Sequence, residues 1–452
     1  MNDRQGGGAR GGRVEDAEDT ALDRGPVESD DFSPAYTRYV LFVLFLVGVF
    51  ALVDRQIFGM LIEPIKQEFA VSDTWLGLAS GLSFALFFAA AGLPIARLAD
   101  RGSRRSILAL GLGAWSLLTL VSGLATSFAQ LVVARLAIGV GEAAGTPTAQ
   151  AIISDYFPPE RRARALSIYS AGASVGVVLA YLVGGLIQEQ WGWRGVFIAL
   201  GAPGVLLALI VRTTVREPRR GRFDGARIEP LRTREALRRL LSMPAYRYIV
   251  ISFALHSLAH SAASMWNPAY LARVHGLSPV EIGTLLGLGS AAFSFVGVIS
   301  GGIVTDRLAR TDRRWLLWLP GLATIAYAPL SWLFLFSSSS ELAIVGLATS
   351  AFLSGLGVPG LHTAIQELAP PAARATASAL NLLVLTLVGS GLGPTFVGIA
   401  NDLFALRFGD DAIRWSLAIA ALVGAVSGVQ ALLGARWLPT RKTEGEKQRE
   451  PA

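Results

Sequence analysis

Hydrophobic residues follow one another in long stretches along this chain, and short polar or charged connections separate the stretches. About twelve of them are roughly 20 residues long, the length at which a helix crosses a hydrocarbon core ~30 Å thick. They begin near residues 37, 75, 107, 129, 165, 195, 246, 278, 315, 341, 375 and 413. The pattern predicts an all-α membrane protein with twelve transmembrane helices.

The composition agrees with this class of protein. Hydrophobic residues make up 52% of the 452 positions and charged residues only 16%, whereas soluble globular proteins carry about 25% charged residues. Cysteine is absent, which excludes disulfides, zinc-thiolate sites and catalytic thiols. The sequence shows neither a nucleophile paired with a base nor a nucleotide-binding loop, which argues against an enzyme.

The basic residues indicate how the chain is oriented. If the N-terminus is cytoplasmic, most of the 40 Lys and Arg residues fall in the two tails and in the connections on that side. The other side holds Lys66, Arg194, Arg273, Arg407 and Arg414. Because cytoplasmic connections carry the excess of basic residues, we expect both termini in the cytoplasm and the protein in a bacterial inner membrane. The pI near 10.0 follows from this topology and gives no reason to expect nucleic acid as a partner.

The chain contains an internal repeat. Residues 70–101 align without a gap with residues 276–307 at an offset of 206, which matches Ser72 with Ser278, Gly77 with Gly283, Gly81 with Gly287 and Asp100 with Asp306. "DYFPPERRARA" and "ELAPPAARATA" match at an offset of 212. Repeated halves are typical of secondary transporters. We therefore expect a disordered cytoplasmic tail (1–34), a six-helix bundle (35–213), a cytoplasmic linker (214–244), a second six-helix bundle (245–437) and a cytoplasmic tail (438–452).

Three motifs resemble a known family. "ARLADRGSRR" (96–105) is similar to the loop motif of the major facilitator superfamily, although Ala96 and Ser103 stand where that motif has Gly. "GGIVTDRLARTDRR" (301–314) is a weaker copy, and "GSGLGPTFVG" (389–398) resembles the Gly-Pro packing motif of the superfamily. The resemblance implies two six-helix bundles that rock around a central site.

Two further stretches resemble one branch of that superfamily. The Asp-Arg pair of the first helix and "RLAIGVGEAAGTPTAQAIISDYFPPERRARALSIY", which begins in the fourth, are similar to the spinster family. Members of that family export lysolipids and sphingolipids. The resemblance implies an amphiphilic lipid as the substrate.

Four charged residues lie inside hydrophobic stretches: Asp54 and Arg55 in the first, Arg135 and Glu142 in the fourth. Each costs ~3 kcal/mol at the centre of the membrane if it faces lipid unpaired. They must therefore face a cavity or one another. A static cluster that pins the two helices together is the alternative, but apolar packing would achieve the same contact without the desolvation of charge.

Helix geometry suggests how these four residues pair. At a rise of ~1.5 Å per residue, Asp54 and Arg135 lie at the same depth, whereas Arg55 and Glu142 differ by ~12 Å and meet only if the helices tilt. We predict both pairings, formed and broken as the cavity opens to either side. Asp54 and Glu142 are the candidates for proton binding. Arg55 and Arg135 are the candidates for binding a phosphate or carboxylate headgroup.

Other polar residues suggest weaker hypotheses. A cytoplasmic gate between the halves would use Asp100, Arg101, Arg104, Arg105, Asp306 and Arg307, although these charges can also serve topology and loop solubility alone. His256 and His260 lie one helical turn apart, but because no third ligand is near, polar packing is favoured over a metal site. The role of His362 stays open.

The second half carries few charges in its hydrophobic stretches, and Phe293, Phe295, Phe352 and Leu356 predict an apolar wall. A cavity with charges on one wall and apolar residues on the other suits an amphiphile. We therefore predict a monomeric, proton-coupled secondary transporter of amphiphilic lipids, without cofactor or metal, that works by alternating access among membrane lipids. An exporter of hydrophobic drugs, an organic-anion symporter and a non-transporting receptor are the alternatives.

Overall fold

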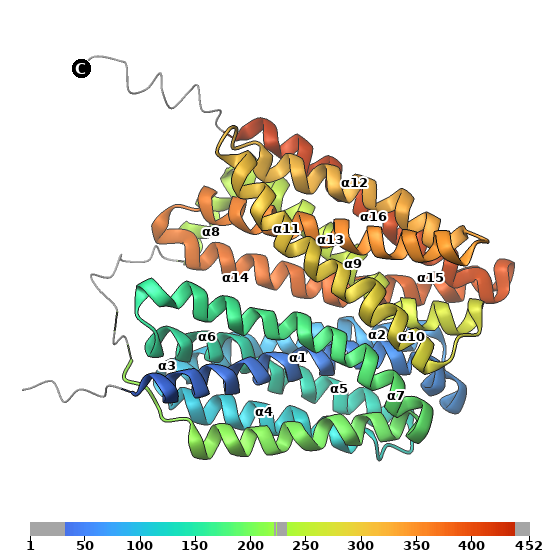
Figure 1. Cartoon of the computed structure of the whole chain (residues 1–452), viewed down its shortest axis with the longest axis horizontal. Helices are drawn as coiled ribbons and strands as arrows, with labels where there is room; N and C mark the ends of the chain where they lie inside the picture. Colours follow the sequence, from blue (N-terminus) through green and yellow to red (C-terminus); the bar gives the residue numbers. More distant parts are fainter. Residues whose placement is uncertain (1–31, 221–222, 224–232, 439–452) are drawn as a thin grey trace, which may run out of the picture.

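The computed structural model describes residues 32–220, 223 and 233–438, and within these ranges the chain forms helices and no strand (Figure 1). The N-terminal half consists of α1 (Pro34–Phe69), α2 (Asp73–Ser80), α3 (Leu82–Arg101), α4 (Arg104–Ser122), α5 (Phe128–Glu142), α6 (Gly145–Tyr156) and α7 (Pro159–Thr214). The predicted tails lie almost entirely outside the described residues, as does part of the predicted linker.

The C-terminal half begins with α8 (Thr233–Ser242), which lies in the predicted linker, and continues with α9 (Pro244–His275). Then follow α10 (Pro279–Leu286), η1 (Gly287–Ala291), α11 (Ala292–Ala309), α12 (Trp315–Phe336), α13 (Ser340–Leu368), η2 (Pro371–Ala373), α14 (Arg374–Val384), η3 (Leu385–Leu392), α15 (Gly393–Phe408), η4 (Gly409–Asp411), α16 (Ala412–Gly434) and η5 (Ala435–Trp437). The segments η1 and η3 are π-helical.

The predicted number of membrane crossings is confirmed. Ten helical stretches of the described chain are long and apolar enough to cross a membrane, and two of them contain 56 and 62 residues. Each of these two is more than twice the ~20 residues that one crossing needs. The first contains Gly192 with a φ of 65°, and the second contains Gly409 with a φ of 55°. Because such φ values interrupt a helix, the chain can reverse there, which makes twelve crossings (Figure 1).

Equivalent positions of the internal repeat have equivalent local structures. Ser72 caps α2 by accepting a hydrogen bond from the amide of Trp75, and Ser278 caps α10 by accepting one from the amide of Glu281. The α-helical geometry is then interrupted at Gly81, between α2 and α3, and from Gly287 onward in η1. The repeat read from the sequence thus reflects two copies of one bent helix.

The two halves pack closely where repeat-equivalent glycines face the partner half. Gly77 of α2 faces the main chain of α15, where an added Cβ would lie 2.7 Å from the carbonyl O of Pro394. Gly283 of α10 faces the main chain of Tyr181 and Gly185 in α7. Any side chain at these glycines would force the two halves apart. The glycines therefore permit the closed packing seen here.

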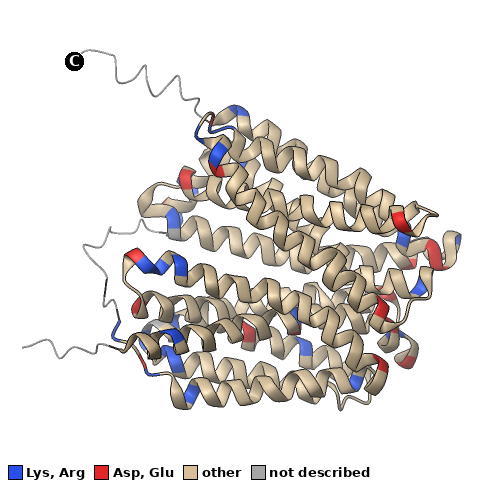
Figure 2. Cartoon of the chain, viewed as in Figure 1, with Lys and Arg blue, Asp and Glu red and all other residues tan. Residues whose placement is uncertain are grey.

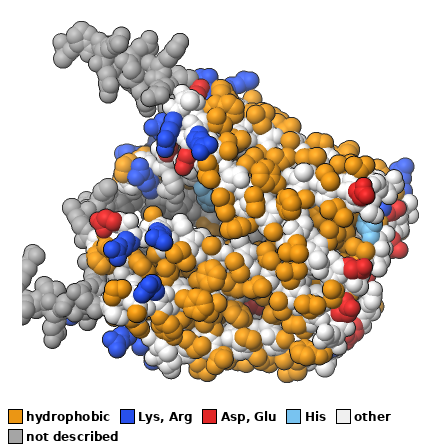
Figure 3. Space-filling model, in the orientation of Figure 1, with side chains coloured by type: hydrophobic (Ala, Val, Ile, Leu, Met, Phe, Trp, Pro, Cys, Tyr) orange, Lys and Arg blue, Asp and Glu red, His pale blue; other side chains and the backbone are white. Residues whose placement is uncertain are grey.

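The two ends of the molecule differ in charge (Figure 2). We call the end that carries the junctions α3–α4, α6–α7 and α11–α12 the basic end, and the other the opposite end. Two ion pairs described at the basic end each stay within one half, as Arg104 pairs with Asp155 and Arg313 with Glu367. Figure 3 shows a broad apolar surface between the two charged ends and a recess between the halves at the basic end.

Candidate functional site

Two adjoining cavities lie between the halves, of about 220 and 200 Å³. They share Leu52, Gln56, Val177, His260 and Ser264 in their linings. The smaller one, called the charged pocket, is further lined by Arg55, Ser80, Phe84, Arg135, Ser257 and Met265. The larger one, called the hydroxyl pocket, is further lined by Asn267, Ser290, Ser294, Tyr327, Ser350 and Ser354.

Arg55 and Glu142 form an ion pair at the charged pocket. The Nε of Arg55 on α1 donates a hydrogen bond of 2.5 Å to Oε2 of Glu142 at the end of α5. The Arg55 guanidinium also lies 4.9 Å from the ring centroid of Phe88 and 5.5 Å from that of Phe84. The predicted pairing of Arg55 with Glu142 is therefore present, despite the difference in depth that counting residues suggested.

Asp54 and Arg135 meet in a different way from the one predicted. Nη1 of Arg135 donates a hydrogen bond of 3.3 Å to the main-chain carbonyl O of Asp54, not to its carboxylate. The carboxylate Oδ1 lies 2.7 Å from the hydroxyl of Thr119 on α4. The Arg135 guanidinium stacks over Phe58, 4.3 Å from the ring centroid. Arg135 thus contacts the backbone of α1, and the acidic group of Asp54 faces α4.

Two atoms of this cluster are buried without a partner among the described residues: Oε1 of Glu142 and Nε of Arg135. A buried polar atom that makes no hydrogen bond costs ~1–3 kcal/mol. The residues themselves are only 2% and 5% exposed. Oε1 of Glu142 can take up a proton or accept a hydrogen bond, whereas the Nε–H of Arg135 needs an acceptor such as a water molecule or an anion.

A hydrogen-bond network joins the two halves beside the pockets. Pro268 has no N–H, so the carbonyl O of Ser264 one turn earlier in α9 loses its usual helical donor. The hydroxyl of Tyr181 on α7 donates a hydrogen bond of 2.8 Å to that carbonyl. Gln56 of α1 donates to the hydroxyl of Ser264 as well. Pro268 therefore frees a main-chain carbonyl of the C-terminal half, and this carbonyl accepts a hydrogen bond from the N-terminal half.

The wall that the C-terminal half presents to the hydroxyl pocket is partly apolar, as predicted, and partly polar. Of the residues predicted for an apolar wall, Phe295 lines this pocket, together with Val298, Phe334 and Leu347, and serine hydroxyls, Asn267 and His260 lie among them. Phe293 is instead 47% exposed on the outer surface. Serine and glycine repeat on both faces of these helices, so the periodicity alone did not show which face turns inward.

The histidines make packing contacts. His256 and His260 stack with ring centroids 6.3 Å apart, and Nδ1 of His260 lies 3.1 Å from the hydroxyl of Ser354. His362 packs edge-on against Phe253 at 4.7 Å. Among the described residues, no group of three metal-ligating side chains occurs. Of these three histidines, His260 alone lines the charged pocket and the hydroxyl pocket.

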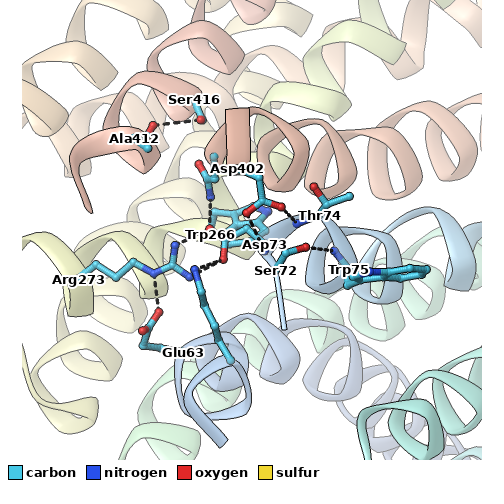
Figure 4. Close-up of polar contacts among 12 residues, drawn as sticks. Glu63, Ser72, Asp73, Thr74, Trp75, Trp266, Arg273, Asp402, Ala412 and Ser416 are labelled. Carbon is cyan, nitrogen blue, oxygen red and sulfur yellow. Dashed lines mark hydrogen bonds and ion pairs between the residues drawn. The ribbon is translucent and has the colours of Figure 1, made fainter. Parts of the chain in front are cut away.

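The opposite end is closed by an ion-pair network that the sequence did not reveal (Figure 4). Arg273 of α9 donates to Oε2 of Glu63 at 2.5 Å and to Oδ1 of Asp73 at 2.9 Å. Lys66 donates to the same Asp73 oxygen at 2.7 Å. Because Arg273 belongs to the C-terminal half and the acidic residues to the N-terminal half, these bonds tie the halves together.

A second contact across the halves caps α2 in the same network (Figure 4). The carboxylate of Asp402 on α15 accepts hydrogen bonds from the amides of Asp73 at 3.1 Å and Thr74 at 2.8 Å. Free amides at a helix N-terminus favour an anionic partner. Asn401 adds a bond of 2.9 Å to the Asp73 carboxylate. The α2–α15 contact is therefore held by charge as well as by the glycine packing at Gly77.

Among the described side chains, the residues predicted for a cytoplasmic gate make no contact that joins the halves in this conformation. Arg104 pairs with Asp155, and its amide and that of Arg105 donate to Glu217, all within the N-terminal half and the segment that follows it. Asp306 lines a surface recess at the basic end of the C-terminal half. Arg101 and Arg307 lie at the ends of α3 and α11, and the Asp100 side chain lies outside the described part of the structure.

The comparisons with known proteins agree with this architecture. The model of the Major Facilitator Superfamily matches residues 44–394. The chain belongs to the Major Facilitator Superfamily. Within it the chain is similar to spinster transporters: spinster homologue 1 of Homo sapiens is 26% identical over 89% of this chain and 81% of its own length. An MFS-type efflux pump of Mycolicibacterium smegmatis is 33% identical over 88% of this chain and 93% of its own.

Solved structures of such transporters are also similar. A bacterial homologue of the human lysosomal transporter spinster, in an inward-facing and unoccupied conformation, superposes with a TM-score of 0.83 at 30% identity, over 90% of this chain and 98% of that one. A D-xylose–proton symporter shares the fold, with a TM-score of 0.69 at 17% identity, over 89% and 98% of the two chains. The all-α fold predicted from the sequence is confirmed, and the chain is an integral membrane protein.

Sequence reasoning found the four charged residues of the site but missed the polar groups that hold them. Thr119, Gln56 and Ser264 are common polar residues of helices and gave no signal. The network at the opposite end left a trace, because Lys66 and Arg273 are two of the few basic residues on that side. Their acidic partners, Glu63 and Asp73, lie close in the sequence to Lys66 but far from Arg273.

Proposed function

We propose that the protein is a proton-coupled transporter of anionic amphiphilic lipids that works by alternating access. Protons bind at Asp54 and Glu142, and the anionic headgroup binds at Arg55 and Arg135. The proposal rests on the geometry of the charged pocket and agrees with the spinster-type relatives.

The observation that carries proton binding is the position of the Thr119 hydroxyl. It lies 2.7 Å from Oδ1 of Asp54 and 3.0 Å from the carbonyl O of Trp115. A hydroxyl has one proton and cannot donate to both acceptors. If Asp54 is protonated, its O–H donates to Thr119, and Thr119 donates to Trp115. Both contacts can then be full hydrogen bonds at once, which supports Asp54 as a proton-binding residue.

Glu142 supports the same role from the other side of the pocket. Its Oε2 accepts the bond from Arg55, while Oε1 is buried with no partner in the described chain. A proton on the glutamate would release Arg55, whose Nη1 and Nη2 have no other hydrogen-bond partner among the described residues. The freed guanidinium presents a planar fork that matches a phosphate or a carboxylate. Proton binding and anion binding are thereby linked.

The conformation supports alternating access. With the basic end in the cytoplasm, the network around Arg273 and Asp73 closes the outer side, and the recess at the basic end opens inward. Arg101, Arg104, Arg105, Asp306 and Arg307, with Asp100, would close that recess when the outer network breaks. Positive charge at the basic end supports an orientation with both termini in the cytoplasm, and the same proposal assigns the protein to a bacterial inner membrane.

A second candidate function is the export of hydrophobic drugs. The 33% identical relative from Mycolicibacterium smegmatis is an MFS-type efflux pump. Phe84 lines the charged pocket beside the two arginines and would suit an aromatic ligand. In this case the buried charges would serve proton coupling alone, and a cation or a neutral compound would bind as well as an anion.

Binding in lipid nanodiscs separates the two candidates. The protein is titrated with dodecyl phosphate, with dodecanol and with dodecyltrimethylammonium, and its thermal stability is followed, because a ligand of the folded state raises it. We expect the phosphate to stabilise the protein at lower concentration than the two other ligands. Equal effects of all three, or preference for the cation, would refute the anionic headgroup and favour the drug exporter.

A further inference from the structure

The hydroxyl pocket is lined by neutral polar groups, which a transporter of a simple anionic amphiphile would not need. None of its lining residues is Asp, Glu, Lys or Arg. Its polar groups are instead neutral, and they come mostly from α9, from the π-helical segment η1 and from α11 to α13, with Gln56 of α1 and Ser174 and Tyr181 of α7 on the other side. A group that carries a charge would be left without a counter-charge here. The pocket therefore suits a neutral ligand group that makes hydrogen bonds.

Several of these neutral groups have their hydrogen-bonding capacity free. Asn267 is only 9% exposed, and its side-chain amide has no hydrogen-bond partner among the described residues. The same holds for the hydroxyls of Ser290 and Ser294, which lie one turn apart on η1 and α11. These groups line the cavity, where a ligand that offers matching donors and acceptors can replace water on them. The lining is thus ready to bind a ligand.

The two pockets adjoin, so one ligand can occupy both of them. Gln56, His260 and Ser264 line both of them. One molecule can therefore place an anionic group near Arg55 and Arg135 and a neutral group near Asn267, a few bonds away. Such a ligand carries both groups at the same polar end.

We propose that the hydroxyl pocket is a specificity subsite for a hydroxyl or amide group that lies a few bonds from the anionic group of the substrate. Asn267, Ser290 and Ser294 make the hydrogen bonds. The proposal deepens the proposed function, because it narrows the substrate to amphiphiles with a hydroxylated or amide-bearing polar end. A purely hydrophobic compound would leave the buried amide unpaired and be rejected.

Two ligands that differ by one hydroxyl test this subsite. 1-O-Dodecylglycerol 3-phosphate and 3-dodecyloxypropyl phosphate are bound to the protein in nanodiscs, and the ratio of their dissociation constants is measured. We expect the hydroxylated ligand to bind about threefold to tenfold more tightly, the range of one neutral hydrogen bond. Asn267→Leu and the milder Ser294→Ala should each bring the ratio towards one.

Matched controls come from the same half of the protein. Asn381 is also buried, with Oδ1 unpartnered, and Ser427 is buried against Ser252. Neither lines the two pockets, so Asn381→Leu and Ser427→Ala should keep the ratio of the wild type. A ratio near one in the wild type, or a ratio unchanged by both Asn267→Leu and Ser294→Ala, would overturn the subsite.

A neutral ligand pair separates this result from the proposed function. 1-O-Dodecylglycerol and 3-dodecyloxypropanol carry the same difference without phosphate. If the phosphate adds no affinity but the hydroxyl still does, the anionic headgroup is wrong and the subsite stands. If the phosphate adds affinity and the hydroxyl does not, the proposed function stands and the subsite is wrong. Absence of binding by all four ligands would refute both.

Discussion

Arg55 donates a hydrogen bond of 2.5 Å to Glu142 and so connects α1 to the end of α5 at the charged pocket. The glutamate side chain is fully buried, whereas that of Arg55 is 29% exposed. The pair therefore has one partner, Arg55, that solvent or a ligand can reach and one, Glu142, that is closed off from solvent. This asymmetry is the basis of the linkage between proton and anion.

Replacing Glu142 with Gln should release Arg55 without a proton. The amide keeps the shape of the protonated acid, so the variant should resemble the wild type at low pH. We expect spin-label distances across the basic end to vary with pH in the wild type and to vary less in Glu142→Gln. If distance distributions in the two proteins respond to pH identically, Glu142 has no part in gating.

Replacing Arg55 with Lys keeps the charge but removes the planar fork. The affinity for dodecyl phosphate should fall by about tenfold, the scale of one charge-assisted hydrogen bond of ~1.5 kcal/mol. Binding of dodecyltrimethylammonium should change less. Titrations of both ligands on the same nanodisc preparation measure this. An equal loss for both ligands, or no loss for either, would show that Arg55 does not hold the headgroup.

Thr119 offers a test of proton binding that leaves all charged residues in place. Thr119→Ser keeps the hydroxyl between Asp54 and Trp115, whereas Thr119→Val removes it at nearly the same volume. Loss of one buried hydrogen-bond partner costs ~1–3 kcal/mol, so we expect proton-driven uptake to fall by about tenfold in the valine variant and to persist in the serine variant. Equal uptake by the two variants would exclude a role for the hydroxyl.

The network at the opposite end should control which side is open. Asp73 is 1% exposed, and breaking a buried pair costs ~3–5 kcal/mol, so Arg273→Gln should shift the population towards the outward-open state by about a hundredfold or more. Double electron–electron resonance across that end measures the shift.

Arg194 provides the matched control, because it pairs with Glu68 through two bonds of 2.6 Å within the N-terminal half. Arg194→Gln also removes an ion pair at the opposite end, but it breaks no contact between the halves. We expect its distance distributions to match those of the wild type. A shift as large as that of Arg273→Gln would show that general loss of charge, and not the contact between halves, moves the population.

The sequence contained enough information for the fold and for the charged residues of the site. Hydrophobic length determines how many times the chain can cross, and the cost of buried charge singles out Asp54, Arg55, Arg135 and Glu142. The repeat matched Gly77 with Gly283, and both prove to be close-packing positions between the halves. These inferences depend on local composition and on spacing along one helix.

The contacts between helices could not be predicted in the same way. Counting residues placed Arg55 and Glu142 at different depths because it assumed straight, untilted helices and ignored the length of the arginine side chain. Asp402 lies 329 positions from Asp73, and nothing in either segment specifies the other. Helical periodicity tells which residues share a face, whereas the choice of partner depends on how helices that are distant in the sequence pack together.

Proton movement during transport tests the central claim most directly. Proteoliposomes that contain a pH-sensitive dye receive dodecyl phosphate from outside, and uptake of the ligand and change of internal pH are recorded together. We predict that wild-type protein moves protons and ligand together, and that Asp54→Asn abolishes the protein-dependent proton signal. Ligand uptake by the wild type with no proton signal above that of protein-free vesicles, or an undiminished signal in Asp54→Asn, would contradict the account.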